Sequence, residues 1–183
     1  RGCDSDSIFA SYEIAKSDSY KKYLNQYDVI YLDIQWCMMD AGSAEQTVSY
    51  LNYHVIEELK EIYPQILLDG IRTAYGAMSC INAQTGVKFI VIIDEWDVLI
   101  RDEAANEAVL QDYINFLRGM FKGSEPTKFI ALAYLTGILP IKKLKTQSAL
   151  NNFMQFTMIT PGVLARYIGF TEDEVKDLCE KYN

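Results

Sequence analysis

One ten-residue stretch, Lys88 to Asp97 (KFIVIIDEWD), constrains the fold of this chain more than any other segment. Five consecutive apolar residues, mostly β-branched, run from Phe89 to Ile93 and lead directly into a cluster of carboxylates. A run that is apolar at every position is typical of a strand in the middle of a parallel sheet, with helices on both faces. Because such sheets bind ligands beyond the carboxyl ends of their strands, we expect a ligand near Asp94, Glu95 and Asp97.

The rest of the chain alternates between expected strands and expected helices. Strands are predicted at 28–34, 88–93 and 128–135, with a short fourth strand at 156–160. This alternation predicts an α/β fold, a three-layer sandwich with a mainly parallel sheet, in one domain over residues 1–183. Helices are expected at 43–63, 66–83, 104–121 and from 171 onward.

Side-chain patterns support three of these helices. Ser43 with Gln46, and Thr171 with Glu174, have the spacing of capping boxes at two helix starts. Two helices carry an apolar stripe at helical spacing that predicts their buried faces: Val48, Leu51, Val55, Leu59 and Ile62 in the first, and Val109, Tyr113, Phe116 and Met120 in the second.

Composition narrows the class of protein. The chain has 183 residues and a net charge of −8, which disfavours a broad surface for nucleic acid or anionic membranes. Its four cysteines form no C-x-x-C pair, so neither a zinc site nor a disulfide framework is indicated, and a reducing, cytoplasmic setting is expected. No apolar run has the length of a membrane span, and no signal peptide is visible.

The acidic end of the 88–97 stretch suits Mg-nucleotide hydrolysis. A hydrophobic strand that ends in Asp-Glu matches the Walker B pattern, in which the Asp holds Mg²⁺ and the Glu polarises the attacking water. The simpler alternative is structural. Any buried strand must end at the surface, and carboxylates at that end are then hydrated without binding a ligand. Four residues alone do not separate these interpretations.

Five motifs, in their joint order and spacing, resemble the AAA-ATPase-like proteins of bacteria, a divergent branch of P-loop ATPases. The resemblance covers essentially the whole chain. It implies that Asp94 associates with Mg²⁺, that Glu95 activates water and that Thr136 is a polar sensor of the γ-phosphate of ATP. The motifs are YDVIYLD at 27–33, FIVIIDEWD at 89–97, LTGILPIKK at 135–143, SALNNF at 148–153 and YIGFTEDE at 167–174.

The chain departs from the family pattern in one decisive respect. A P-loop requires G-x-x-x-x-G-K-[ST], yet none of the ten glycines is followed by lysine. The family places that loop upstream of the stretch that begins at Arg1. We therefore expect a truncated ATPase domain that lacks the phosphate-binding strand and helix, is inactive alone and binds neither ATP nor Mg²⁺ tightly.

The same truncation has consequences for partners. The strand at 128–135 would be left with an open apolar edge, which predicts a homo-oligomer, a borrowed strand or a fourth strand shifted inward. A further, nuclease-like domain is expected downstream, and nucleic acid is expected as a partner only through it.

Two other functions are considered. One is a non-catalytic interaction module with an ATPase-like fold, which the absence of an upstream P-loop would favour. The other is a metal-dependent nuclease using Asp94, Glu95 and Asp97. Nuclease sites of this kind usually have a lysine soon after the acidic pair, where this chain has Trp96 and Asp97, so the nuclease ranks last.

The remaining polar candidates have simpler interpretations. Trp96 and Asp97 are interpreted as an aromatic lid and a helix start, and Asp33 as a sheet-end carboxylate. His54 lies off the apolar stripe of its helix, so we expect it at the surface or at its boundary. The lysine cluster Lys142, Lys143 and Lys145 is expected to be solvated rather than to face phosphates or nucleic acid. Nothing in the sequence singles out Arg118 or Arg166 as a trans-acting arginine finger, and Asn151 and Asn152 match the family motif without an assigned role.

Overall fold

The computed structural model describes residues 4–103, 105–140, 150, 152–165, 167 and 169–182. It contains two compact units, Arg1–Asn151 and Asn152–Asn183. The expectation of a single domain over 1–183 stays a prediction. No helix in the described ranges is both long enough and apolar enough to cross a membrane.

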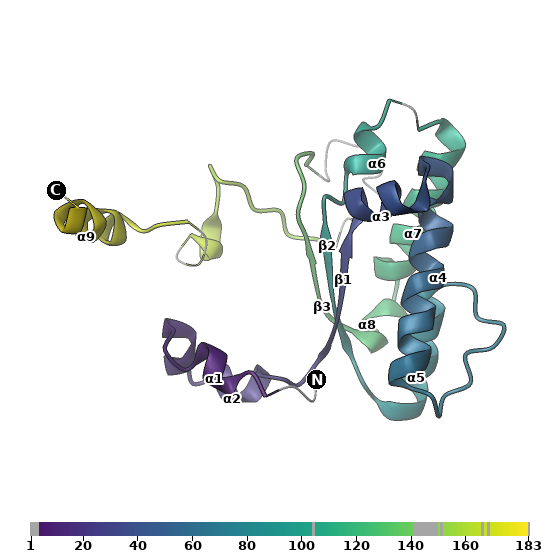
Figure 1. Ribbon diagram of the computed structural model, residues 1–183, viewed down its shortest axis with the longest axis horizontal. Helices are drawn as coiled ribbons and strands as arrows, with labels where there is room; N and C mark the ends of the chain where they lie inside the picture. The colour runs from purple at the N-terminus through teal and green to yellow at the C-terminus, as the bar shows by residue number, and fades with distance from the viewer. Residues whose placement is uncertain are drawn as a thin grey trace. The chain divides into compact units, whose positions relative to one another are not determined.

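The first unit is built on a sheet of three parallel strands, in the order β1-β2-β3 (Figure 1). These strands, β1 (Asp28–Asp33), β2 (Phe89–Asp94) and β3 (Ile130–Leu135), match the three longest predicted strands. The α/β class and the parallel sheet are therefore confirmed. As the unbroken apolar run predicts, β2 is the central strand.

Helices occupy the crossovers between the strands, as parallel pairing requires. Before β1 the chain forms short turns of helix, α1 (Asp6–Phe9), η1 (Glu13–Lys16) and α2 (Tyr20–Tyr23). The later helices of this unit are α3 (Ile34–Ala41), α4 (Ala44–Ile62), α5 (Ala74–Thr85), α6 (Val98–Arg101), α7 (Glu107–Phe121) and α8 (Pro126–Phe129).

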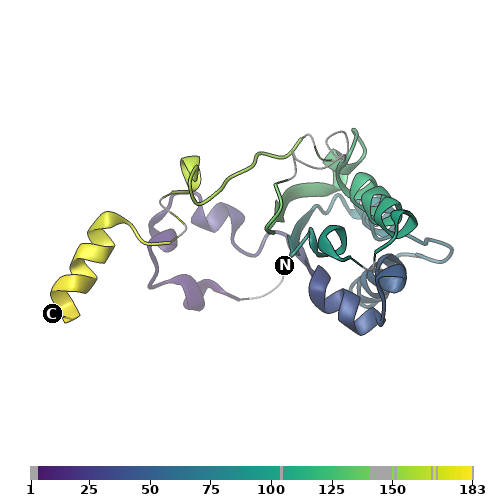
Figure 2. The ribbon, with the colours of Figure 1, turned by 90° about the horizontal axis from the view of Figure 1, so that it is seen from above.

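One face of the sheet is covered by α4, α5 and α7, which lie on the same side of the strands (Figures 1 and 2). Phe89, Val91 and Ile93 alternate along β2 and are fully buried on this face. All four predicted stripe residues of α7 are buried with them, so the hydrophobic core follows the predicted pattern.

The opposite face of the sheet is uncovered by the described helices. Val29, Tyr31 and Leu132 are 55%, 58% and 56% exposed, and Tyr134 is also exposed. The register pairs Tyr31 with Ile92, and Ile92 with Tyr134, so these side chains share one face. A helical layer on this side, which a three-layer sandwich requires, stays a prediction.

Helix α4 has the predicted extent, but two details at its ends differ from the expectation. The expected Ser43–Gln46 capping box is wrong, because the Ser43 side chain makes no capping bond, while the Ser43 carbonyl accepts from the Thr47 hydroxyl at 3.0 Å. Ile62 is 61% exposed rather than buried, since it lies in the last turn, just before Tyr63 and Pro64. The middle of the predicted stripe, Leu51, Val55 and Leu59, is buried as expected.

Two other boundaries differ from the sequence expectation. Helix α3, which was not predicted, begins directly after β1 because the Asp33 carboxylate accepts from the Trp36 amide at 2.9 Å. Helix α5 begins at Ala74 rather than near residue 66, because the Thr73 side chain caps it. Gly86 ends α5 in the left-handed conformation, which glycine adopts readily.

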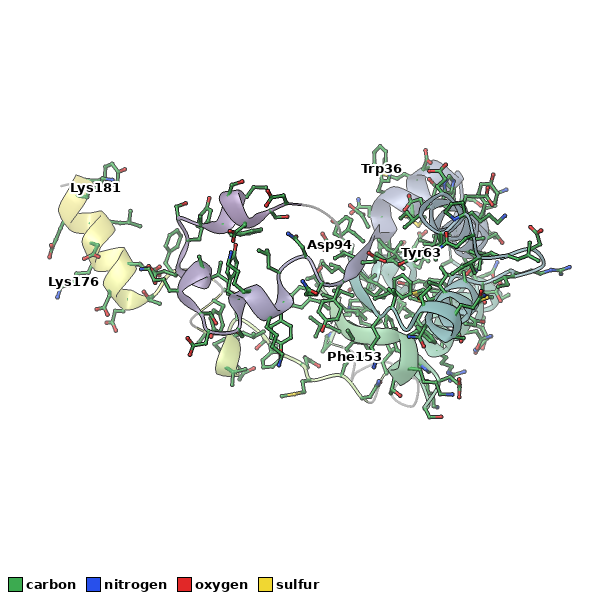
Figure 3. All side chains as sticks on the ribbon, turned by 90° about the horizontal axis from the view of Figure 1, so that it is seen from below. Trp36, Tyr63, Asp94, Phe153, Lys176 and Lys181 are labelled. Atoms are coloured by element: carbon green, nitrogen blue, oxygen red, sulfur yellow. The ribbon has the colours of Figure 1, made fainter. Side chains whose placement is uncertain are left out.

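The second unit contains η3 (Gly162–Leu164) and α9 (Glu172–Tyr182), from which Lys176 and Lys181 project (Figure 3). The Thr171–Glu174 capping box is confirmed. The Thr171 amide donates to the Glu174 carboxylate at 2.7 Å, and the Glu174 amide donates back to the Thr171 hydroxyl at 3.3 Å. The backbone bond from Thr171 is the main cause that lowers the pKa of Glu174.

The predicted fourth strand at 156–160 is wrong. These residues form a turn in which the Thr160 amide donates to the Thr157 hydroxyl at 3.0 Å. The backbones of Thr157 and Thr160 bond to each other in this turn, and local bonds of this kind compete with the ladder of a sheet. The sheet therefore has three strands in the part of the chain that the structure describes, with β3 at an edge.

Candidate functional site

The carboxyl ends of all three strands contribute to one cluster of polar side chains. Asp94 is the last residue of β2, and Thr136 directly follows β3. Asp33 pairs with Asp94 in the parallel register, so the ends of β1 and β2 are level. Two backbone bonds join the ends of β2 and β3, because Thr136 donates to the Ile93 carbonyl at 2.9 Å and Trp96 donates to the Thr136 carbonyl at 3.0 Å.

Asp94, which is labelled in Figure 3, accepts hydrogen bonds from three donors in three different segments. The Thr136 hydroxyl and the Glu95 amide, the latter at 3.0 Å, both donate to Oδ1. The Tyr31 hydroxyl donates to Oδ2 at 3.2 Å. The bond from Thr136 is the largest cause that lowers the pKa of Asp94, against the opposing effect of burial. The Asp94 carboxylate is therefore charged at neutral pH.

The structure thus brings together two of the three site residues predicted from the sequence, Asp94 and Thr136. Tyr31 was missed. Its place was nonetheless implied by the predicted strands: it stands two residues before the end of β1, so it shares a sheet face with Asp33 and, across the register, with Asp94. What the sequence did not give was the register itself.

Glu95, the third predicted site residue, lies where the chain turns out of the sheet. Its φ of 51° is in the left-handed region, which costs a residue with a side chain roughly 1 kcal/mol or more. From this turn the Glu95 side chain reaches Arg101. The Arg101 Nη2 atom donates to Glu95 Oε2 at 2.6 Å.

Asp97 is fully buried and connects three segments. Its Oδ2 atom accepts from the Leu139 amide at 2.7 Å and from Arg101 Nε at 2.9 Å, and its Oδ1 atom accepts from the Ile138 amide at 3.3 Å. The sequence placed Asp97 at a helix start, and it does precede α6. Its carboxylate also holds the loop after β3, which sequence reasoning did not anticipate.

Trp96 is buried, which agrees with a structural role rather than with an exposed lid. Its carbonyl accepts from the Tyr113 hydroxyl at 2.7 Å, which anchors the turn to α7. Burial is the main cause that raises the pKa of Tyr113, so its hydroxyl keeps its proton. Gly137 packs against Trp96 and Asp97 so closely that an added Cβ would lie 2.6 Å from Trp96 Cδ1 and 2.5 Å from Asp97 Oδ1.

A comparison with protein families identifies the class of this chain. A family model described as "Predicted AAA-ATPase" matches residues 3–146, which is most of the sequence and includes every site residue named above. The chain belongs to the AAA-ATPase-like family. The motifs at 148–153 and 167–174 lie outside the matched range. Searches of curated proteins and of solved structures returned no match.

Membership of the AAA-ATPase-like family supports an ATPase-like function and implies dependence on nucleotide and Mg²⁺ in general. The residues at the sheet end fit Mg²⁺ in one specific way. The described residues contain no group of three His, Cys, Asp or Glu side chains close enough to bind a metal together. Mg²⁺ usually keeps several waters and is bound by one or two carboxylates plus substrate phosphates. A single carboxylate such as that of Asp94 is therefore compatible with Mg²⁺.

The other polar candidates lie elsewhere. Asp33 caps α3, which agrees with its interpretation as a sheet-end carboxylate. His54 is exposed on α4, where its ring lies 4.1 Å from that of Tyr50 between centroids. Arg118 is on α7, and Asn152 begins the second unit. Lys142, Lys143, Lys145, Asn151 and Arg166 lie outside the described residues.

Proposed function

We propose that this chain carries the Walker B half of an ATPase site and takes part in Mg-ATP hydrolysis in the intact protein. One observation carries the proposal: in a chain of the AAA-ATPase-like family, the carboxylate that ends the central strand is bonded to a hydroxyl that ends the adjacent strand. Asp94 and Thr136 meet where parallel sheets bind their ligands.

Each residue has a defined role in this proposal. Asp94 is held charged by Thr136, Tyr31 and the Glu95 amide, so it is ready to hold Mg²⁺ directly or through water. When bound, Mg²⁺ supplies positive charge that neutralises the developing charge on the phosphates. Thr136 donates its hydroxyl hydrogen to Asp94 and is positioned to sense a neighbouring phosphate. Glu95 orients and polarises the attacking water.

The phosphate-binding loop is contributed from outside this chain, since the sequence has no Gly-Lys dipeptide. In the proposed P-loop NTPase-like core, the strand that carries this loop pairs with the open edge of β3. A helix that follows that strand then covers the face that exposes Val29, Tyr31 and Leu132. This arrangement completes the three-layer sandwich.

A non-catalytic interaction module is the second candidate, and one observation favours it. The uncovered sheet face is apolar and aromatic, and exposed patches of this kind often bind other proteins. Association of copies through the edge of β3 belongs with this candidate and stays a prediction. The nuclease alternative is weakened by the position of Asp97, which is buried and bonded to Arg101 and to the 138–139 amides instead of facing Asp94.

The experiment that tests the ATPase proposal is the substitution Glu95→Gln in the intact protein. Gln keeps the size of the side chain and removes the charge that polarises water. We expect ATP turnover to fall by about 100-fold or more while ATP remains bound, measured by phosphate release and by calorimetry. Glu125→Gln, at an exposed residue ion-paired with Lys128, is the matched control.

Unchanged turnover in Glu95→Gln would contradict the role of Glu95. An intact protein that binds no ATP would instead favour the interaction module. The chain of 183 residues alone is expected to bind ATP weakly, so tight binding by this chain would contradict the need for an external phosphate-binding loop.

A further inference from the structure

We propose that Arg101 is a positioning residue that, anchored by Asp97, holds the Glu95 carboxylate in its working place. This inference rests on the proposed function, because it assigns Arg101 a role only if Glu95 acts on water. The three residues are called the Glu95–Asp97–Arg101 clamp. Neither motif spacing nor the Walker B pattern assigns any part to Arg101.

The anchor of the clamp is the buried carboxylate of Asp97. A buried charge is stable only when it is paired and hydrogen-bonded, and Asp97 meets both conditions through Arg101 Nε and the amides of Ile138 and Leu139. Arg101 stands four residues after Asp97, across one turn of α6, so the pair is close by helical geometry. The guanidinium plane is therefore fixed from one side.

The other end of the guanidinium reaches Glu95. The Nη2–Oε2 distance of 2.6 Å is that of a strong charge-assisted hydrogen bond. The side chains of Arg101 and Glu95 are only 30% and 36% exposed, so water screens the pair less than it screens the surface pairs of the chain. Because Arg presents several donors in a rigid plane, one side chain holds two carboxylates at once.

The clamp compensates for the geometry of the turn. Glu95 directly follows the end of β2 and has a positive φ, so it belongs to neither a strand nor a helix that would restrict its side chain. The bond to Arg101 supplies that restriction. Asp97 also holds the loop that follows Thr136, so the same carboxylate ties the Glu95 turn to the predicted sensor segment. A displacement of about 1 Å in a reacting group can cost 100-fold in rate, which makes such positioning consequential.

A double-mutant cycle on ATP turnover by the intact protein tests the clamp. Arg101→Ala is expected to lower kcat roughly 10- to 100-fold, with little change in KM for ATP. Arg101→Lys keeps one charged donor and is expected to recover part of the lost rate. Because Arg101 acts through Glu95, adding Arg101→Ala to Glu95→Gln should lower kcat by less than about 3-fold. Lys128→Ala, at an exposed helix pair, is the control and should leave kcat unchanged.

The outcomes separate this inference from the proposed function. If Glu95→Gln abolishes turnover while Arg101→Ala and Arg101→Lys match the wild type, the clamp is wrong and the ATPase assignment stands. If Arg101→Ala lowers kcat by the same factor in the wild type and in the Glu95→Gln variant, Arg101 does not act through Glu95 and the inference is again overturned. If the wild type does not hydrolyse ATP, the proposed function fails and the clamp fails with it. Should Arg101→Ala not fold, as circular dichroism would show, the cycle is run with Arg101→Lys.

Discussion

The two faces of the sheet differ although the same three strands build both. On one face Phe89, Val91 and Ile93 are fully buried under the helices. On the other, Val29, Tyr31 and Leu132 are more than half exposed, and that face ends in Asp94. Because side chains alternate along each strand, one face of the sheet stabilises the fold and the other carries the candidate site.

This difference is invisible in composition, since both faces are apolar. In a strand that alternates apolar and polar residues, the pattern indicates which face is buried. The β2 and β3 strands are apolar along most of their length and give no such indication. Exposed apolar patches of this kind often mark a surface that binds another segment or protein. We propose that the phosphate-binding segment covers this face.

A substitution on the covered face of the sheet is expected to cost the most stability. Phe89→Ala removes a fully buried ring and is expected to lower the free energy of unfolding by about 3 to 5 kcal/mol. Leu132→Ala, on the uncovered face of β3, is the matched control and should cost less than about 1 kcal/mol in this chain. Chemical denaturation of the two variants measures both values. Equal losses would mean that the two faces are equally packed in solution.

A substitution of Thr136, at the end of the uncovered face, is expected to cost less stability. Thr136→Val removes the hydroxyl that donates to Asp94, and is expected to lower the free energy of unfolding by about 1 kcal/mol at neutral pH. That bond is also the main cause that lowers the pKa of Asp94 below its ordinary value of 3.8. In the wild type, the resulting stability is fully present above about pH 4 and is lost as the pH falls through the folded pKa.

The pH dependence distinguishes this interpretation from a simple packing effect. In Thr136→Val the pKa of Asp94 moves back toward its ordinary value, so the stability gap between wild type and variant should shrink below about pH 4. Thr127→Val is the control, because the Thr127 hydroxyl donates to the Ser124 carbonyl rather than to a carboxylate. A gap that stays constant with pH for Thr136→Val would contradict the link between Thr136 and the charge on Asp94.

Sequence reasoning predicted the sheet well because the apolar runs are long and unbroken. These runs predict the three strands, their parallel pairing and the central place of β2. The helical spacing of apolar residues predicts the buried stripe of α7. Sequence reasoning failed where local polar groups decide the outcome. Helix α3 depends on the Asp33 cap and α5 on the Thr73 cap, while the turn at 157–160 replaces a predicted strand.

The candidate site was predicted in part for a similar reason. Asp94 and Thr136 stand at strand ends, so a correct sheet brings them together. Tyr31 required the register, and Arg101 required the path of the chain after Glu95, which turns at a positive φ that no motif encodes. Contacts that depend on a single turn are not recoverable from spacing.

Asp94 is proposed to belong to a Mg-nucleotide site, and the Mg²⁺ dependence of ATP binding tests this role. Calorimetry on the intact protein would compare the wild type with Asp94→Asn, each with Mg²⁺ and with a chelator. We predict that Mg²⁺ tightens ATP binding by the wild type about tenfold or more and has little effect on Asp94→Asn. If Asp94→Asn retains the full Mg²⁺ dependence of the wild type, Asp94 does not hold the metal and the proposed site is wrong.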